Sequence, residues 1–285
     1  MSHSRTGFQP VGFGPGGEQK SDRLEPVLLE ARNLSKAYPA HHGAVVKAVD
    51  DVSLELAAGE TLAIVGESGS GKTTLARMLL RLIDPDSGEL LLEGRDFLAA
   101  RGAELRALRR EMQMVFQDPF GSLDPRMRVD AIVGEPLEIH EPQLSRAERR
   151  SRVIEILRAA GLGEDALARY PHEFSGGQRQ RIGIARALVL RPRLVVADEP
   201  VSALDVSVGA QILELLQNLQ RDFALTYLLI SHSLPVVAQL ATRIAVMQRG
   251  RIVETGPATQ ILTAPAHPYT QSLIAAIPAL PESTA

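Results

Sequence analysis

Short apolar runs recur along the chain between amphipathic and polar stretches. Runs of this length are too short for a typical helix but suit strands that are buried on both faces. Helical periodicity between the runs places a helix after most of the predicted strands, which indicates an α/β fold. The predicted strands of this kind are Leu62–Val65, Met112–Phe116, Leu194–Ala197 and Thr226–Ile230.

A second group of predicted strands shows the alternation of a half-exposed sheet. Val52, Leu54 and Leu56 alternate with polar residues, so that one face of their strand is apolar. Tyr38 lies in a turn-like segment that separates the first two of these strands. The strands of this group are Val27–Leu34, Val45–Leu56, Glu89–Glu93, and a pair around the Gly250 turn, Ile244–Met247 and Ile252–Glu254.

Helical patterns dominate from Ala131 to Leu190. Within this stretch, Ser145–Ala160 carries an apolar stripe bordered by arginines, and Gln143–Arg193 is rich in arginine as a whole. A solvated helix face explains such a run, and a surface for an anionic partner or a membrane is the alternative. The other predicted helices are Leu75–Ile83, Ala103–Arg110, Gln178–Leu190 and Ser207–Arg221.

Composition describes a globular protein with a sizeable core. The 285 residues are 45% apolar, and no run approaches the roughly 18 apolar residues that span a bilayer. Met1–Lys20 lacks a signal-peptide core, so we expect the chain to remain in the cytoplasm, and residues 1–26 to form a disordered tail. The absence of cysteine excludes disulfides and thiolate metal sites, and a net charge of −3 gives no general argument for nucleic-acid binding.

The stretch Gly66–Thr73 matches the phosphate-loop pattern G-x-x-x-x-G-K-[ST] between a predicted strand and a predicted helix. Glycines let the backbone N–H groups turn toward an anion, and the start of the helix adds unpaired donors. Lys72 would reach the β- and γ-phosphates, and the Thr73 hydroxyl would ligate Mg²⁺. We therefore predict that the chain binds a nucleoside triphosphate.

Polar side chains follow three other predicted strands. Asp198 ends one strand and would hold Mg²⁺, while the adjacent Glu199 would act as general base for the attacking water. His232 would contact the γ-phosphate, although a histidine at a strand end is more often structural. Gln117 would ligate the metal or the water through its amide. These residues supply what hydrolysis requires beyond a phosphate cradle.

Residues Ser175–Gln178 open a second helix that has the features of an anion site. Ser175 can cap this helix, and the paired glycines leave its N–H groups accessible. One γ-phosphate can hardly be enclosed by both helix starts of the same molecule if they lie on different subdomains. We therefore expect a dimer in which Ser175 and Gly177 close over the ATP that is held by Lys72 of a second subunit.

The motifs follow one another along the chain as the phosphate loop, Gln117, the Ser175–Gln178 signature, Asp198-Glu199, Ser202–Asp205 and His232. This is the order seen in ABC ATPases, and the chain resembles this family from about Val27 to Pro278. The resemblance implies a P-loop NTPase with a RecA-like core, an antiparallel β subdomain and an inserted α-helical subdomain. It implies an ATPase domain over 27–264, with the helical subdomain at about 131–190, and a C-terminal extension over 265–285. It also implies that Tyr38 stacks on adenine and that Asp205 contacts the partner subunit. The implied nucleotide-binding residues are Tyr38, Gly66, Glu67, Ser68, Gly69, Ser70, Gly71, Lys72, Thr73, Thr74, Ser175, Gly176, Gly177, Gln178 and Asp205.

Finer motifs resemble the oligopeptide/dipeptide importer branch, and in particular the second of the two ATPases that such importers usually carry. They are Val46–Ser53, Val115–Pro119, Asp198–Ser207 and His267–Thr270. Two departures are that Ser233 replaces the usual Asp after the histidine, and that the extension lacks the cysteines that some relatives use for a cluster.

The resemblance implies work at the cytoplasmic face of the inner membrane. The expected partners are two permease subunits, a second ATPase (a paralogue, or otherwise a second copy) and, indirectly, an extracytoplasmic substrate-binding protein; nucleic acid is not expected. The permease would dock near Gln117–Arg128. Two alternatives are a soluble ABC ATPase acting on nucleic acid or ribosomes, and a P-loop kinase or GTPase. The first would need two nucleotide units or a coiled-coil insertion, and the second leaves the Ser175–Gln178 glycines unexplained.

Overall fold

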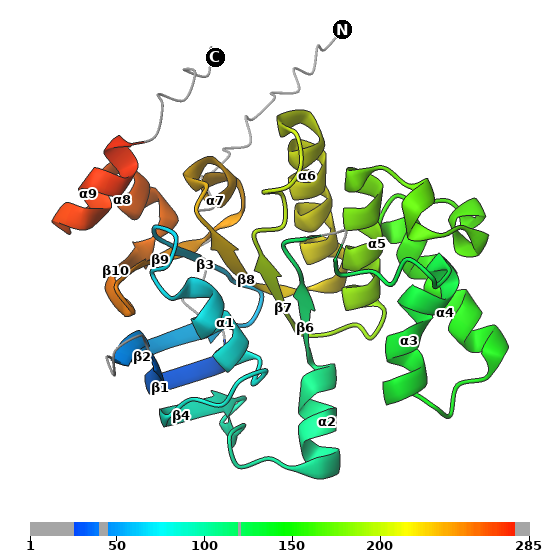
Figure 1. Cartoon of the computed structure of the whole chain (residues 1–285), viewed down its shortest axis with the longest axis horizontal. Coiled ribbons are helices and arrows are strands. Elements are labelled where there is room, and N and C mark those ends of the chain that lie inside the picture. The colour runs from blue at the N-terminus through cyan, green and yellow to red at the C-terminus, as the bar shows by residue number, and fades with distance from the viewer. Residues whose placement is uncertain (1–25, 40–44, 119–120, 277–285) are drawn as a thin grey trace, which may run out of the picture.

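The computed structural model describes residues 26–39, 45–118 and 121–276. The predicted tail therefore lies outside the described residues except for Pro26. A six-stranded sheet runs through the molecule in the order β10-β9-β3-β8-β7-β6 (Figure 1), with parallel pairing throughout except between β9 and β10. Its strands are β3 (Thr61–Val65), β6 (Met112–Val115), β7 (Leu194–Asp198), β8 (Thr226–Ser231), β9 (Arg243–Gln248) and β10 (Arg251–Pro257).

A second, antiparallel sheet has the order β2-β1-β4-β5. The predicted alternation is confirmed, because Val52, Leu54 and Leu56 are buried while Ser53 and Glu55 between them are exposed. The turn predicted around Tyr38 is wrong, because this residue lies in β1 and pairs with Val46. The strands are β1 (Val27–Pro39), β2 (Val45–Ala57), β4 (Ser87–Leu92) and the unpredicted β5 (Arg95–Asp96).

The larger sheet separates two hydrophobic cores. Side chains alternate between its faces, so that Leu62 and Ile64 of β3 enter one core while Ala63 and Val65 enter the other. The core of Leu62 also contains residues of the antiparallel sheet and of α1 (Lys72–Leu79) and α2 (Gly102–Arg110). The opposite core is covered by α3 (Val129–His140), α4 (Arg146–Ala159), α5 (Gly176–Leu188), α6 (Val206–Phe223) and α7 (Leu234–Leu240).

Helices α3, α4 and α5 pack together at the β6 end of the sheet (Figure 1). The predicted stripe of α4 is confirmed, because Val153, Ile156 and Leu157 are buried. Surface carboxylates pair with several of the arginines here, as in the bridges Arg149–Glu138 and Arg191–Glu155. These pairs favour a solvated face over a bare cationic surface.

Several boundaries differ from the predictions. Helix α1 begins at Lys72 and ends at Leu79 rather than spanning Leu75–Ile83, because the phosphate loop leads directly into it. Three short helices were not predicted: α7, α8 (Ala258–Thr263) and α9 (Pro268–Ala275). Within the described ranges, every helix is too short or too polar to cross a membrane.

Candidate active site

The phosphate loop connects the end of β3 to the start of α1 at the centre of the larger sheet. Its shape requires glycine at two positions. A Cβ on Gly66 (φ +151°) would lie 2.1 Å from the carbonyl oxygen of Met247, and one on Gly71 (φ +108°) would lie 2.1 Å from that of Ala48. The backbone of the loop is therefore held against β2 and β9, which leaves no room for larger residues.

Lys72 folds back onto the loop that it follows. Its Nζ donates to the carbonyl oxygens of Gly66 and Glu67, both at 2.8 Å, and only 6% of the residue is exposed. Burial lowers the pKa of Lys72, although the carboxylates of Glu199, Asp198 and Glu67 oppose this effect. A phosphate group could replace the two carbonyl oxygens as a partner of the ammonium group.

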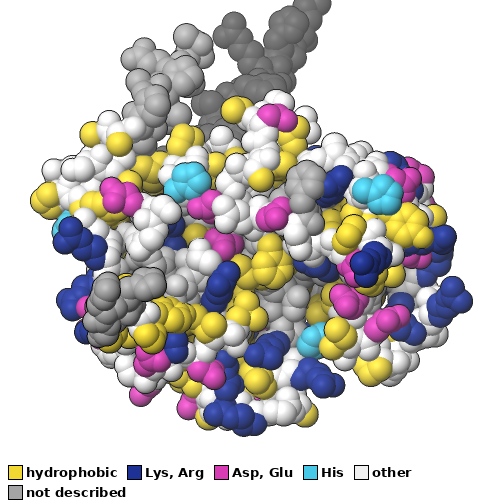
Figure 2. Space-filling view, viewed as in Figure 1, with side chains coloured by type: hydrophobic (Ala, Val, Ile, Leu, Met, Phe, Trp, Pro, Cys, Tyr) yellow, Lys and Arg dark blue, Asp and Glu magenta, His cyan; other side chains and the backbone are white. Residues whose placement is uncertain are grey.

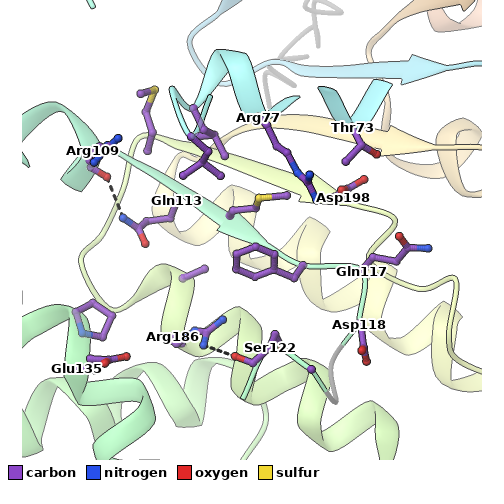
Figure 3. A pocket seen from close by; sticks show the side chains of 18 of the residues that line it. Thr73, Arg77, Arg109, Gln113, Gln117, Asp118, Ser122, Glu135, Arg186 and Asp198 are labelled. Carbon is purple, nitrogen blue, oxygen red and sulfur yellow. Dashed lines mark hydrogen bonds between the residues drawn. The ribbon is translucent and has the colours of Figure 1, made fainter. Parts of the chain in front are cut away.

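Asp198 at the end of β7 is 5% exposed, and its Oδ1 has no hydrogen-bond partner among the described residues. Burial and the neighbouring charge of Glu199 raise the pKa of Asp198, and Arg77 and Lys72 only partly offset this. A buried carboxylate oxygen without a donor suits a cation. Thr73 and Gln117 lie at the same end of the cavity as Asp198 (Figure 3), and both offer oxygen atoms. This donor set fits Mg²⁺, which typically takes few protein ligands and completes its shell with phosphate and water.

Glu199 is brought together with Gln117 and His232, as the sequence predicts. Gln117 Nε2 donates to Glu199 Oε2 at 2.8 Å, and His232 Nδ1 lies 2.7 Å from Glu199 Oε1. An ionised carboxylate only accepts, so Nδ1 carries the proton in this pair. Glu199 has a left-handed backbone (φ +48°), a conformation that is rare for residues other than glycine and is often found at functional sites.

Ser233, which replaces the expected aspartate, lies just before α7. Its side chain does not cap that helix, and its backbone N–H donates to Ser231 Oγ at 2.9 Å. The pairing of His232 with Glu199 is therefore made without help from an acidic neighbour at position 233.

The Ser175–Gln178 segment caps α5 as predicted. Ser175 Oγ accepts from the backbone N–H of Gln178, whose side chain in turn accepts from the backbone N–H of Ser175. A Cβ on Gly177 would lie 2.4 Å from a methyl group of Val208, so the glycine permits close contact with α6. The Ser175–Gln178 segment does not line the cavity that contains Thr73 and Asp198, although α5 reaches this cavity through Arg186 and Ala187.

The remaining predicted residues are on the surface or in the loop. Asp205 caps α6 by accepting from the backbone N–H of Val208 at 2.9 Å. Tyr38 is 40% exposed, and the Lys36 ammonium group lies over its ring, 5.9 Å from the ring centroid. The other predicted loop residues, Ser68, Gly69, Ser70 and Thr74, lie in the loop or in the first turn of α1.

A cavity of about 770 Å³ extends from Thr73 and Asp198 to α3 and α5. Figure 3 shows Arg77 directed toward Asp198 at one end, and Arg109 and Glu135 at the other. Sequence reasoning missed Arg77, although its position one helical turn after Thr73 places both on one face of α1. It also missed Tyr269, which contacts the phosphate loop from the C-terminal part of the chain.

Comparisons with known proteins agree with this geometry. The family description "ABC transporter" matches residues 49–202, and "Oligopeptide/dipeptide transporter, C-terminal region" matches residues 253–285. The chain is 53% identical over 261 residues to the "Probable peptide ABC transporter ATP-binding protein y4tS" of Sinorhizobium fredii, covering 90% of this chain and 74% of the relative. It is 51% identical over 253 residues to the "Dipeptide transport ATP-binding protein DppF" of Lactococcus lactis, covering 88% and 81%.

A solved structure matches the fold as well. The "Dimeric structure of a post-hydrolysis state of the ATP-binding cassette MJ0796 bound to ADP and Pi" superposes with a TM-score of 0.73 at 31% identity. The match covers 81% of this chain and 99% of that chain. The predicted P-loop NTPase fold with its antiparallel sheet and helical elements is thereby confirmed.

Proposed function

The chain belongs to the ATP-binding subunits of ABC transporters, and we propose that it powers an importer that takes up peptides or a similar small solute through a separate membrane permease. The observation that carries the proposal is the contact of Glu199 with both Gln117 and His232, next to a phosphate loop whose lysine is buried. Binding and hydrolysis of ATP are activities of the family.

Nucleotide binding would rearrange the loop first. Lys72 would exchange the carbonyl oxygens of Gly66 and Glu67 for phosphate oxygens, and the N–H groups at the start of α1 would face the same anion. The exposed ring of Tyr38 would stack on the adenine.

Hydrolysis would depend on Glu199 as the group that accepts the proton of the attacking water. Both of its oxygens accept hydrogen bonds in this structure, from Gln117 and His232. Release of one of these donors would open an oxygen to water. His232 would then orient the carboxylate from one side, with its Nε2 available for the γ-phosphate if that nitrogen is protonated.

Thr73, Asp198 and Gln117 would hold Mg²⁺ through the hydroxyl, the orphaned carboxylate oxygen and the amide oxygen. The ion would neutralise charge on the phosphates and on Asp198. Asp198 itself would remain ionised at neutral pH in the presence of the cation, since a nearby positive charge lowers the pKa of a carboxyl group.

We propose a head-to-tail dimer, because Ser175–Gln178 lies outside the cavity that contains Thr73 and Asp198 of the same chain. Ser175–Gln178 would then close over nucleotide that is bound to the partner, and Asp205 would lie at the contact between subunits. That the matched ATP-binding cassette is dimeric and bound to ADP and Pi supports a dimer. The second subunit would be a paralogue or another copy of this chain.

The cavity between Gln117 and α3 would receive the permease at the cytoplasmic face of the membrane. Its lining combines apolar side chains such as the exposed Phe116 with Arg109, Arg186 and Glu135. A mixed surface of this kind suits a short amphipathic segment of a partner. Because the cavity also reaches Asp198 and Gln117, the docked partner could respond to the state of the nucleotide.

The test is the substitution Glu199→Gln, which retains the size and shape of the side chain while removing the base. We expect ATPase activity to fall by about 100-fold or more, with MgATP binding retained and a dimer accumulating in size-exclusion chromatography. Glu214→Gln, on the exposed side of α6, makes the same change of charge and should behave like the wild type. Normal turnover of Glu199→Gln would refute the role of Glu199, and co-purification with ribosomes instead of a permease would refute the transport proposal.

A further inference from the structure

The C-terminal helix α9 brings one side chain to the phosphate loop. The hydroxyl oxygen of Tyr269 accepts a hydrogen bond of 3.1 Å from the backbone N–H of Glu67, which precedes it by 202 residues. Tyr269 also packs against the core that contains Val65, at the end of β3. The contact thus joins the matched C-terminal region to the first turn of the loop.

Tyr269 is held in place by the sheet itself. Glu254 of β10 accepts from the backbone N–H groups of Ala266 at 2.7 Å and His267 at 3.1 Å. His267 Nδ1 then caps α9 by accepting from the N–H of Tyr269 at 3.1 Å. Figure 1 shows α8 and α9 beside β10, at the end of the sheet opposite β6. The tyrosine is therefore connected through β10 and β9 to the strand that carries the loop.

Glu67 is contacted on both sides of its backbone. Its N–H donates to Tyr269, and its carbonyl oxygen accepts from Lys72 Nζ at 2.8 Å. When Lys72 turns to a phosphate group, the carbonyl oxygen keeps only the hydrogen bond from the backbone N–H of Ser70, at 3.2 Å. The Tyr269 hydroxyl holds the preceding peptide, between Gly66 and Glu67, through a contact that does not involve Lys72.

We propose that Tyr269 is a positioning residue for nucleotide binding, which keeps the phosphate loop in its binding shape while Lys72 exchanges partners. The inference rests on the proposed role of Gly66–Thr73 as the nucleotide cradle. It assigns to the C-terminal region a direct function in ATP affinity, through one hydroxyl group.

Tyr269→Phe in the full chain removes the hydroxyl and leaves the ring. The dissociation constant for MgATP, measured by calorimetry, should rise about threefold to tenfold, which is the range for one neutral hydrogen bond. Hydrogen exchange of the Glu67 amide should become faster without nucleotide. The ATPase rate at saturating ATP should change less than about twofold, since loss of a contact made equally in the ground and transition states raises KM and leaves kcat unchanged.

Tyr227→Phe is the matched control. The Tyr227 hydroxyl is buried and donates to the carbonyl oxygen of Leu216 at 3.1 Å, remote from the loop. This variant should lower the melting temperature without changing MgATP affinity or exchange at Glu67, which separates loss of stability from loss of positioning.

Two results would overturn the inference: unchanged exchange at Glu67 in Tyr269→Phe, or faster exchange with unaltered affinity. Failure of the cradle assignment would be recognised separately, because Lys72→Ala would then bind MgATP as the wild type does. The exchange experiment needs no nucleotide, so its result does not depend on that assignment.

Discussion

Asp198 allows a prediction in which loss of function and gain of stability coincide. Its side chain is buried at the end of β7, and Oδ1 lacks a donor among the residues that the structure describes. We expect Asp198→Asn to abolish ATP hydrolysis because it weakens the cation site. The same change should raise the melting temperature of the nucleotide-free protein, because it removes a buried charge.

The direction of the pKa shift determines whether the charge of Asp198 stabilises or destabilises the folded state. Burial and Glu199 raise the pKa of Asp198 above its ordinary value of 3.8, so the ionised group disfavours the folded state. This penalty is absent below the pKa of the unfolded chain. It develops as the pH rises through the interval between the unfolded and folded pKa values, and it is complete above the folded pKa.

The gain comes from the charge that the substitution removes, because the asparagine amide still leaves a polar atom without a partner. A single stabilising substitution commonly contributes about 0.5–2 kcal/mol. Each kcal/mol moves the melting temperature of a domain of about 250 residues by roughly 2 °C. Asp198→Asn should therefore melt about 1–4 °C above the wild type at pH 7.5, measured by calorimetry in EDTA without nucleotide.

Asp205→Asn makes the same chemical change with the opposite expected sign. Hydrogen bonds from the backbone of Val208 and from the hydroxyl of Ser207 lower the pKa of Asp205, so its charge stabilises the folded state. That contribution is present above the unfolded pKa and is lost as the pH falls through the folded pKa. Asp205→Asn should thus melt below the wild type at pH 7.5.

The comparison of the two variants can refute the reasoning. The advantage of Asp198→Asn should diminish as the pH is lowered through the raised pKa toward 3.8, because the folded wild-type carboxyl group becomes protonated in this interval. A lower melting temperature for Asp198→Asn, a shift of the same sign in both variants, or an advantage independent of pH would show that the buried charge of Asp198 is not the cause.

Two further predictions compare matched positions. Gly66→Ala combines backbone strain of about 1–2 kcal/mol with overpacking of about 1–3 kcal/mol against Met247. Gly69→Ala adds only the strain, because its Cβ would meet no atom within 4 Å. Urea melts should separate the two variants, and equal losses of stability would contradict the contact with Met247. Ser175→Ala and Ser145→Ala each remove a capping box with the same 3.3 Å bond and should cost about 1 kcal/mol, but only Ser175→Ala should reduce the ATPase rate of the assembled dimer. Equal ATPase rates in the two serine variants would remove Ser175 from the nucleotide site.

The sequence was most informative where burial and chemistry coincide. Strands such as β3 and β7 are buried on both faces, so their apolar runs are continuous, and the polar residues at their ends stand out. The extension of β1 to Pro39 was missed because its last residues are polar or exposed, and pairing with β2 rather than side-chain pattern decides their structure. The three short helices were missed because a helix of fewer than nine residues gives little periodicity.

Contacts between residues that are distant in the sequence could be predicted only where a rule of the fold brings them together. The meeting of Gln117, Glu199 and His232 was expected because all three follow strands that end at one edge of the sheet. The contact of Tyr269 with Glu67 follows no such rule, because it depends on how the connection after β10 places α9. The left-handed backbone of Glu199 was likewise not apparent, since nothing in its residue type favours that conformation.

The hydrogen bond between Glu67 and Tyr269 also concerns the order in which the protein is made. A ribosome completes the phosphate loop early and reaches Tyr269 only 202 residues after Glu67. While those residues are being made, the nascent chain therefore contains the whole nucleotide-binding motif without the group that steadies its first turn. We expect the loop to acquire its final shape only after the ribosome has passed Tyr269, when its affinity for ATP should rise by about threefold to tenfold.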